Sequence, residues 1–272
     1  MMPYYVGIDG GGTKTAVELR TRGSAAHSRA VFGPLNCNSD RTAAAKALTD
    51  TLAWLAAQPE GLAGCDGLCI GSAGISNPDA YNFIQDIIRA GGYTGPLQIV
   101  GDQVTALAGA LGQPVGTVLI AGTGSICYAR TADGREARSG GWGHLIGDEG
   151  SGYALGRDAL AAVARAWDGW GEKTLLSQLL AEQMELDDQK KIISYTYGGD
   201  KSRIAALAPL VEQAAGQDDA VALEIIRDNA VKMTGLVGAV ARQLGIKAGK
   251  VAMLGGLLEH DTCLLYTSPS PR

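Results

Sequence analysis

The chain has 272 residues, of which 46% are hydrophobic and 39 are glycine, and its formal net charge is −5. This length is enough for two compact lobes, and the many glycines predict frequent turns. A negative charge without a run of lysine or arginine argues against a nucleic-acid-binding surface. The apolar stretches are too short to span a bilayer, and the residues before the first expected strand have neither the charged nor the apolar region of a leader. We therefore expect a cytoplasmic protein without a membrane partner.

The first part of the chain alternates short β-rich runs with runs of helical period, which predicts an α/β layer structure. Asp40 is expected to cap the first helix, and Pro78 to precede the second. We place the end of this N-terminal lobe at residue 113, within Gly112-Gln113-Pro114. The expected strands are 4–9, 15–20, 27–32, 68–70 and 97–100, and the expected helices are 40–57, 79–90 and 103–111.

Residues 114–262 are expected to form a C-terminal lobe that is mostly helical after Ser151. A turn is expected at Asp133-Gly134, and the Tyr-Gly-Gly-Asp run at 197–200 predicts a sharp break in the helical pattern. The last expected strand leads directly into Gly255-Gly256. The expected strands are 116–121, 125–130 and 251–254, and the expected helices are 151–167, 172–185, 202–215 and 218–244.

The last ten residues, 263–272, break the preceding pattern abruptly and resemble the translated read-through of a sequencing adaptor. We interpret them as a non-native tail and exclude them from fold reasoning; the alternative is a natural Pro/Ser-rich flexible end. On the first interpretation the C-terminal lobe is incomplete, and the chain is expected to be marginally stable or inactive.

The five cysteines form an odd total and contain no C-x-x-C pair. This arrangement is typical of free thiols rather than of a disulfide framework, and we expect most of them to be buried. They are Cys37, Cys65, Cys69, Cys127 and Cys263.

Two glycine-rich turns of the same design lie about a hundred residues apart, in the segments 6–17 and 118–128. Each is flanked by apolar β-rich runs, so each predicts a strand, a glycine turn and a second strand. Glycines let backbone N–H groups converge, and such concavities bind anions. We expect the two turns to grip one polyphosphate from both sides, although simple hairpins use similar residues.

Neither the P-loop pattern nor a strand-to-helix G-x-G-x-x-G is present. The motifs at 9–13, 122–125 and 140–152 instead resemble the actin/sugar-kinase/Hsp70 ATPase superfamily and, within it, the N-acetylglucosamine kinase and BadF/BadG ATPase family. The resemblance extends from Tyr4 to about Leu258. It implies an α/β, two-lobed actin-like ATPase (ribonuclease H-like) fold, with duplicated sheet-and-helix domains and a cleft between them.

The resemblance implies ATP as cosubstrate and Mg²⁺ as cofactor, with Asp9 holding the metal through water. The alternative for Asp9 is a hairpin-stabilising turn residue. Lys14 is equally consistent with a phosphate ligand and with a solvent-facing strand residue. The residues implied to bind ATP are Gly10, Gly11, Gly12, Thr13, Lys14, Gly122, Thr123, Gly124, Gly255 and Gly256.

Asp102 follows an expected strand, at the place where open α/β sheets bind ligands. The resemblance implies that it is the catalytic base; the alternative is an N-cap for the next helix. The implied sugar-binding residues are Asn36, Cys37, Asp102, Gly141, Trp142, Gly143 and Asp148. For three of them other roles are open, namely a turn residue (Asn36), a packing anchor (Trp142) and a cap for the helix near Ser151 (Asp148).

These motifs favour an ATP-dependent kinase of an amino sugar, most directly N-acetylglucosamine. One alternative is an ATPase activator that holds an iron–sulfur cluster, and another is a catalytically silent sugar-sensing module. The expected partner is the small-molecule sugar, and a homodimer is compatible with the resemblance.

Overall fold

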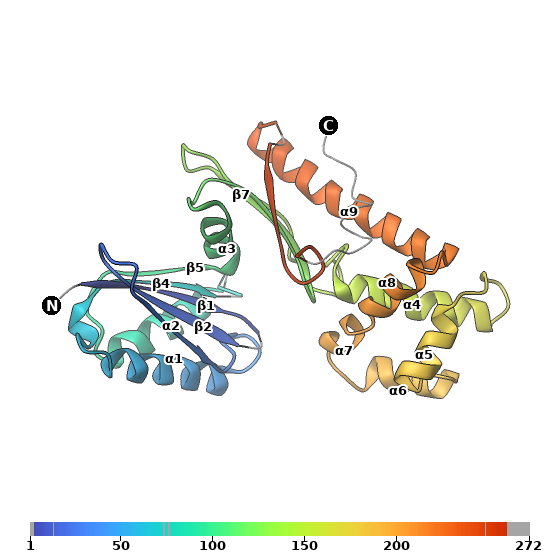
Figure 1. The fold of residues 1–272 in the computed structure, drawn as a ribbon, viewed down its shortest axis with the longest axis horizontal. Helices are drawn as coiled ribbons and strands as arrows, with labels where there is room; N and C mark the ends of the chain where they lie inside the picture. The colour runs from blue at the N-terminus through green and yellow to red at the C-terminus, as the bar shows by residue number, and fades with distance from the viewer. Residues whose placement is uncertain (1–2, 13, 73, 76, 248, 260–272) are drawn as a thin grey trace. The chain divides into compact units, whose positions relative to one another are not determined.

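The computed structural model describes residues 3–259 except Thr13, Ala73, Ser76 and Ala248, and it divides into two compact units, Met1–Gly109 and Ala110–Arg272. Each unit has its own sheet and its own hydrophobic core (Figure 1). Within the described ranges, no helix is both long enough and apolar enough to cross a membrane. The expected tail at 263–272, including Cys263, lies outside the described residues.

The first unit is built on a sheet with the strand order β3-β2-β1-β4-β5. β1 pairs antiparallel with β2, and β2 with β3, whereas β1, β4 and β5 run parallel. The carboxyl ends of the three parallel strands therefore meet at one edge. The bounds are β1 Tyr4–Gly10, β2 Thr15–Thr21, β3 His27–Phe32, β4 Cys65–Ser72 and β5 Leu97–Gly101.

Helices α1 (Arg41–Ala56) and α2 (Pro78–Ala90) cover one face of this sheet, and α3 (Asp102–Leu111) lies on the other (Figure 1). Asp40 caps α1 by accepting hydrogen bonds from two backbone N–H groups, as expected. Asn77 caps α2, and Pro78 occupies its first turn. Alternate residues of β1 point into the core, which is why Val6 and Ile8 are buried while Gly7 and Asp9 are exposed. A short 3₁₀ turn, Leu62–Gly64, precedes β4.

The described part of the second unit contains a four-stranded sheet with the order β8-β7-β6-β9. β6 pairs antiparallel with β7 but parallel with β9, so the ends of β6 and β9 lie together. The strands are β6 Gly116–Ala121, β7 Ser125–Arg130, β8 Glu136–Gly140 and β9 Val251–Leu254. The helices are α4 Gly152–Trp167, α5 Leu176–Met184, α6 Gln189–Tyr197, α7 Lys201–Ala205, α8 Ala208–Ala215 and α9 Ala220–Leu244.

The main elements of both units confirm the sequence-based expectations, but several predictions were wrong in detail. β8 and α6 were not predicted, and the expected helix at 202–215 is divided into α7 and α8. Pro209 lies in the first turn of α8, where its missing N–H is tolerated, and it prevents α7 from continuing. The expected helix at 172–185 is shorter, and the strand at 68–70 extends over the whole of β4.

The described cysteines are free, as predicted. Cys37, Cys65 and Cys127 are buried, whereas Cys69 is half-buried. Burial raises the pKa of the Cys127 thiol to about 12, so this residue is an inert part of the core.

Candidate functional site

The first glycine turn joins β1 to β2 at the carboxyl edge of the first sheet. Gly11 N–H donates to Lys14 O at 3.0 Å, and Leu35 N–H donates to Gly11 O at 2.9 Å. A Cβ at Gly10 would lie 2.5 Å from the Leu35 side chain, so only glycine lets the turn pack this closely. Gly12 is exposed, with nothing within 4 Å of the place where a Cβ would be. Thr13, an expected ATP ligand, lies outside the described residues.

Asp9 is the penultimate residue of β1 and lies beside this turn. Although its side chain reaches solvent, desolvation raises the pKa of its carboxyl group, and the nearby positive charge of Lys14 lowers it in part. Lys14 itself is exposed. The pair therefore places one carboxylate and one cation beside the first glycine turn.

Asp102 is the first residue of α3, directly after the end of β5. Gln103 N–H donates to Asp102 Oδ1 at 3.0 Å. Asp102 lies inside α3, and this bond joins it to the next residue, whereas an N-cap side chain accepts from the second or third N–H group of the helix. Burial raises the pKa of the Asp102 carboxyl, and the negative charge of Asp9 raises it further. The two acidic residues thus interact electrostatically at the same edge of the sheet.

The loop after β3 carries Asn36 and Cys37. Asn36 Oδ1 accepts a hydrogen bond from Asn38 N–H at 3.1 Å, so its amide oxygen is used within the loop. Asn38 is held in turn, because its Nδ2 donates to Gly74 O at 3.0 Å and its Oδ1 accepts from Asn77 Nδ2 at 3.3 Å. The Cys37 side chain packs into the core of the first unit, so we expect any contact with substrate to come from its backbone.

The second glycine turn joins β6 to β7 in the second unit. Two of its carbonyl groups accept bonds from the start of α4: Gly152 N–H donates to Gly122 O at 2.8 Å, and Tyr153 N–H to Thr123 O at 3.3 Å. Gly122 N–H donates to Gly124 O at 2.9 Å, so this group, expected to bind phosphate, is used inside the turn. The N–H groups of Thr123 and Gly124 take no part in these bonds.

Asp148 lies directly beneath the second turn, with a backbone φ of 63° and an exposed fraction of 3%. Its Oδ1 accepts a bond from Ser125 N–H at 3.2 Å, and a Cβ at Gly124 would come within 2.8 Å of that same oxygen. Its buried Oδ2 has no hydrogen-bond partner in the described structure, and Lys201 Nζ lies 3.8 Å away. The helix-capping alternative is wrong for Asp148, because Ser151 caps α4.

Gly255 and Gly256 follow β9, next to the same turn. Gly255 has φ 96°, and a Cβ there would lie 2.4 Å from the Ala121 carbonyl oxygen. Leu257 N–H also donates to that oxygen, at 3.3 Å. The glycine pair is therefore packed against the last residue of β6, immediately before the second glycine turn.

The segment Gly141-Trp142-Gly143 follows β8. Gly141 N–H donates to Ser125 O at 2.9 Å, which ties this segment to the start of β7. Trp142 is exposed, and the Arg138 guanidinium stacks 5.4 Å from the centre of its ring. His144 packs edge-on against Tyr153, with the ring centroids 4.8 Å apart.

A match to a family model covers residues 6–265, and the family is the BadF/BadG/BcrA/BcrD ATPases. The chain belongs to this family. Its fold is the two-lobed actin-like ATPase fold that the resemblance implied, shared with sugar kinases of known structure. As a member of this ATPase family, the chain uses ATP.

Three proteins that are similar to this BadF/BadG family member are sugar kinases or a candidate sugar kinase. The chain is 37% identical to the N-acetylmuramic acid/N-acetylglucosamine kinase of Clostridium acetobutylicum, over 95% of this chain and 87% of that protein. It is 30% identical to the N-acetyl-D-glucosamine kinase of Dictyostelium discoideum, over 96% and 87%. A solved structure of a candidate N-acetylglucosamine kinase from Chromobacterium violaceum matches with a TM-score of 0.81 and 29% identity, over 94% of this chain and 88% of that one.

Each unit of the BadF/BadG chain thus gathers part of the expected site at one edge of its sheet. The first unit brings together Asp9, the first glycine turn and Asp102, and the second unit brings together the second turn, Asp148 and the Gly255 turn. Sequence reasoning missed Asn38, Asn77 and Lys201 as neighbours of these groups. The Asn-x-Asn spacing at 36–38 was a usable signal for the first, but nothing local in the sequence joins residue 38 to residue 77.

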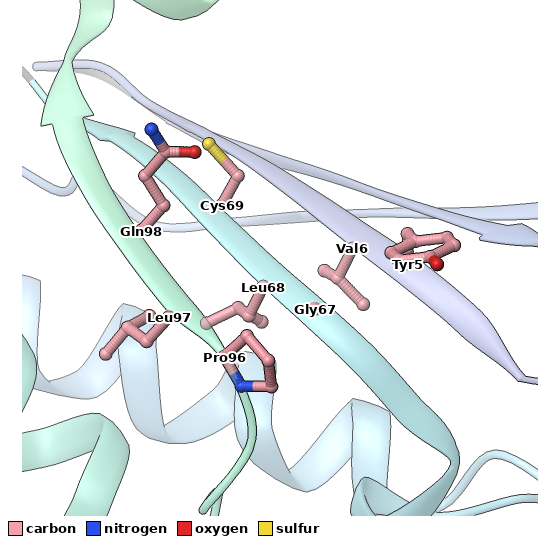
Figure 2. Close-up of a pocket in the computed structure, with 8 residues that line it drawn as sticks. All are labelled: Tyr5, Val6, Gly67, Leu68, Cys69, Pro96, Leu97 and Gln98. Carbon is pink, nitrogen blue, oxygen red and sulfur yellow. The ribbon is translucent and has the colours of Figure 1, made fainter.

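A separate hollow of about 300 Å³ lies on the first sheet, away from the carboxyl ends of the strands. Figure 2 shows Cys69 and Gln98 projecting on one face of the sheet, and Leu68 and Leu97 on the other. The hollow shares no residue with the expected ATP or sugar site, and we assign it no part in the activity.

Proposed function

We propose that this chain is an ATP-dependent kinase that transfers the γ-phosphoryl group to a hydroxyl of an amino sugar, N-acetylglucosamine in the first place. The observation that carries the proposal is the position of Asp102. A half-buried carboxylate lies at the same sheet edge as the first glycine turn, in a chain 37% identical to an N-acetylmuramic acid/N-acetylglucosamine kinase.

In this proposal ATP is bound by backbone groups from both lobes, which we divide at residues 1–113 and 114–262. Gly10 to Thr13 and Lys14 contact the phosphates from the first lobe. Gly122 to Gly124 contact the β- and γ-phosphates from the second, chiefly through the N–H groups of Thr123 and Gly124. Gly255 and Gly256 pack against the adenosine. The need for ATP favours a cytoplasmic location.

We assign Mg²⁺ to Asp9, through water. The residues fit this ion, because Mg²⁺ keeps most of its hydration and needs only one or two carboxylates beside the phosphates. Asp9 supplies one such carboxylate, and its position beside an anion-binding turn meets that requirement. When bound, the ion neutralises phosphate charge.

Asp102 accepts the proton of the attacking hydroxyl. Its Oδ1 is held by Gln103 N–H, so we assign this role to Oδ2. The sugar oxygen forms its bond to the γ-phosphorus while the bond from that phosphorus to the β–γ bridging oxygen breaks, and ADP leaves. A raised pKa suits a general base, because the carboxylate then holds the transferred proton more firmly.

The sugar is bound by Asn36, the Cys37 backbone and Asp102 from the first lobe, and by Gly141-Trp142-Gly143 and Asp148 from the second. The buried Oδ2 of Asp148 supports this role, because it accepts no hydrogen bond in the described structure and has only the Lys201 ammonium group 3.8 Å away. A buried acceptor without a hydrogen bond is costly, and a ligand hydroxyl would supply that bond. Exposed Trp142 offers an apolar wall to the sugar ring.

Sugar-dependent turnover tests the proposal against its alternatives. We expect ADP release, followed with a coupled enzyme assay, to depend on an added sugar and to be fastest with N-acetylglucosamine or N-acetylmuramic acid among a set that includes glucosamine and glucose. Release of ADP at the same rate without sugar would instead support an ATPase activator. Sugar binding measured by calorimetry, without any turnover, would support a sensing module.

The Asn36 carboxamide gives a second prediction. Because Oδ1 is used by Asn38 N–H, substrate receives a hydrogen bond from Nδ2. Asn36→Asp keeps the oxygen but removes the donor, so we expect the KM for sugar to rise by roughly 10-fold, the value of about one hydrogen bond. The KM for ATP serves as the internal control and should stay unchanged. An equal rise in both constants would contradict a direct contact with the sugar.

A further inference from the structure

Helix α3 approaches the first sheet unusually closely at Gly71. This residue lies in β4, where it pairs with Asp9 of β1 on one side and Val100 of β5 on the other. Side chains of paired residues project on the same face of a sheet. α1 and α2 cover one face of the sheet and α3 lies on the other (Figure 1). A side chain at residue 71 would point toward α3, because the atoms nearest to an added Cβ belong to Thr105 of that helix.

The space above Gly71 is filled by Thr105, one turn into α3. A Cβ at residue 71 would lie 2.1 Å from Thr105 Oγ1, 2.8 Å from its Cγ2 and 2.9 Å from its Cβ. Contacts below 3.0 Å are essentially never seen for a real Cβ. Rotation of the threonine side chain does not relieve them, because its Cβ is itself too close.

Thr105 is directly connected to Asp102. Its hydroxyl donates a hydrogen bond to the Asp102 carbonyl oxygen at 2.9 Å, and Asp102 Oδ1 is bound by Gln103 N–H in the same turn. The backbone and the carboxylate of Asp102 therefore move with the first turn of α3. A shift of Thr105 shifts the carboxylate.

We propose that Gly71 is a positioning residue, whose missing side chain sets the depth of α3 on β4 and so places the Asp102 carboxylate against the reacting hydroxyl. The inference rests on the proposed kinase function, in which Asp102 is the base. It extends that function to a residue that touches neither substrate nor nucleotide.

The helix, rather than the strand, is the part that must move in response to a Cβ. β4 is bonded to a neighbour on each side, and Gly71 and Ser72 are buried, so the strand is fixed within the sheet. Bringing Thr105 Oγ1 from 2.1 Å to the ordinary contact range of 3.4–4 Å requires α3 to rise by at least about 1 Å. A misplacement of that size costs on the order of 100-fold in rate.

The test compares kinetic constants of four variants. For Gly71→Ala we expect kcat to fall roughly 100-fold, with the KM for ATP unchanged. Thr105→Ala alone should lose only a few-fold in kcat, through the missing bond to Asp102. In the double variant Gly71→Ala/Thr105→Ala the two nearest atoms are gone, and only a contact at 2.9 Å remains. We therefore expect it to recover part of the lost kcat and to exceed Gly71→Ala.

Gly7→Ala is the matched control, because it makes the same change in the neighbouring strand at a place with nothing within 4 Å. It should keep the wild-type kcat, and thermal melts should show all four variants folded at the assay temperature. A wild-type kcat in Gly71→Ala, or a double variant no faster than Gly71→Ala, overturns the proposal. If the unaltered protein is folded at the assay temperature but shows no sugar-dependent ADP release, the kinase function itself has failed. If Gly71→Ala does not fold, the kcat of the double variant is compared with that of Thr105→Ala. That comparison isolates the effect of the Cβ added at residue 71.

Discussion

Replacing Asp102 by asparagine is expected to lower kcat by about 10²- to 10⁴-fold, the usual contribution of a general base. The amide is nearly the same shape and still lets Gln103 N–H reach an oxygen, so α3 keeps its first turn. The variant cannot accept the hydroxyl proton. Steady-state kinetics, with nucleotide binding measured separately by calorimetry, should show lost turnover and intact affinity for ATP. Wild-type turnover would remove Asp102 from the role of base.

The raised pKa of the Asp102 carboxyl predicts two further results, one for the pH profile of the wild type and one for the stability of this variant. Since only the ionised carboxylate accepts a proton, the acid limb of the wild-type kcat profile should lie above the ordinary aspartate value of about pH 4. The folded protein also holds this proton more tightly than the unfolded chain. This contribution to stability is therefore full below the unfolded pKa and is lost as the pH rises through the folded pKa. At neutral pH, Asp102→Asn should consequently melt at a higher temperature than the wild type.

Gly255→Ala should cause the largest loss of stability among the glycine substitutions of the site. Its φ of 96° is strained for any side chain, which costs about 1–3 kcal/mol. The added Cβ would also press on the Ala121 backbone, which cannot rotate away, and overpacking of this kind costs about 1–3 kcal/mol more. A total of roughly 2–6 kcal/mol is a large share of a typical folding free energy of about 5–15 kcal/mol.

Urea denaturation and ATP titration measure the two consequences of this substitution. We expect a lower free energy of unfolding together with weaker ATP binding, because the Gly255 turn packs against the residue that precedes the second glycine turn. Gly256→Ala is the control for stability, since nothing lies within 4 Å of its added Cβ. Equal unfolding free energies for the two variants would contradict the argument.

Much of this architecture follows from local sequence. The strand–glycine turn–strand units were predictable, because apolar β-rich runs on either side of a glycine run leave few other choices. The Asp40 cap and the Pro78 entry followed from capping chemistry in the same way. β8 was not predictable, since Glu136 to Gly140 lacks β-branched or aromatic residues and its strand form depends on pairing with β7.

The candidate site was predictable as a set of residues but not as a set of contacts. The burial of Asp148 under Gly124 and the pairing of Asn38 with Asn77 join positions 24 and 39 residues apart. No periodicity encodes such distances. Gly71 illustrates the same limit, because its importance comes from Thr105, which only the packing of α3 brings above it.

The hydrogen bonds between the second glycine turn and the start of α4 have an electrostatic consequence. In a trans peptide the C=O and N–H groups point in opposite directions, so carbonyls directed at the helix turn the N–H groups of Thr123 and Gly124 outward. The partial positive charge at the amino end of α4 polarises these two peptide groups and strengthens their outward donors. A long helix can thereby attract a phosphate group through two intervening amides, without any contact of its own.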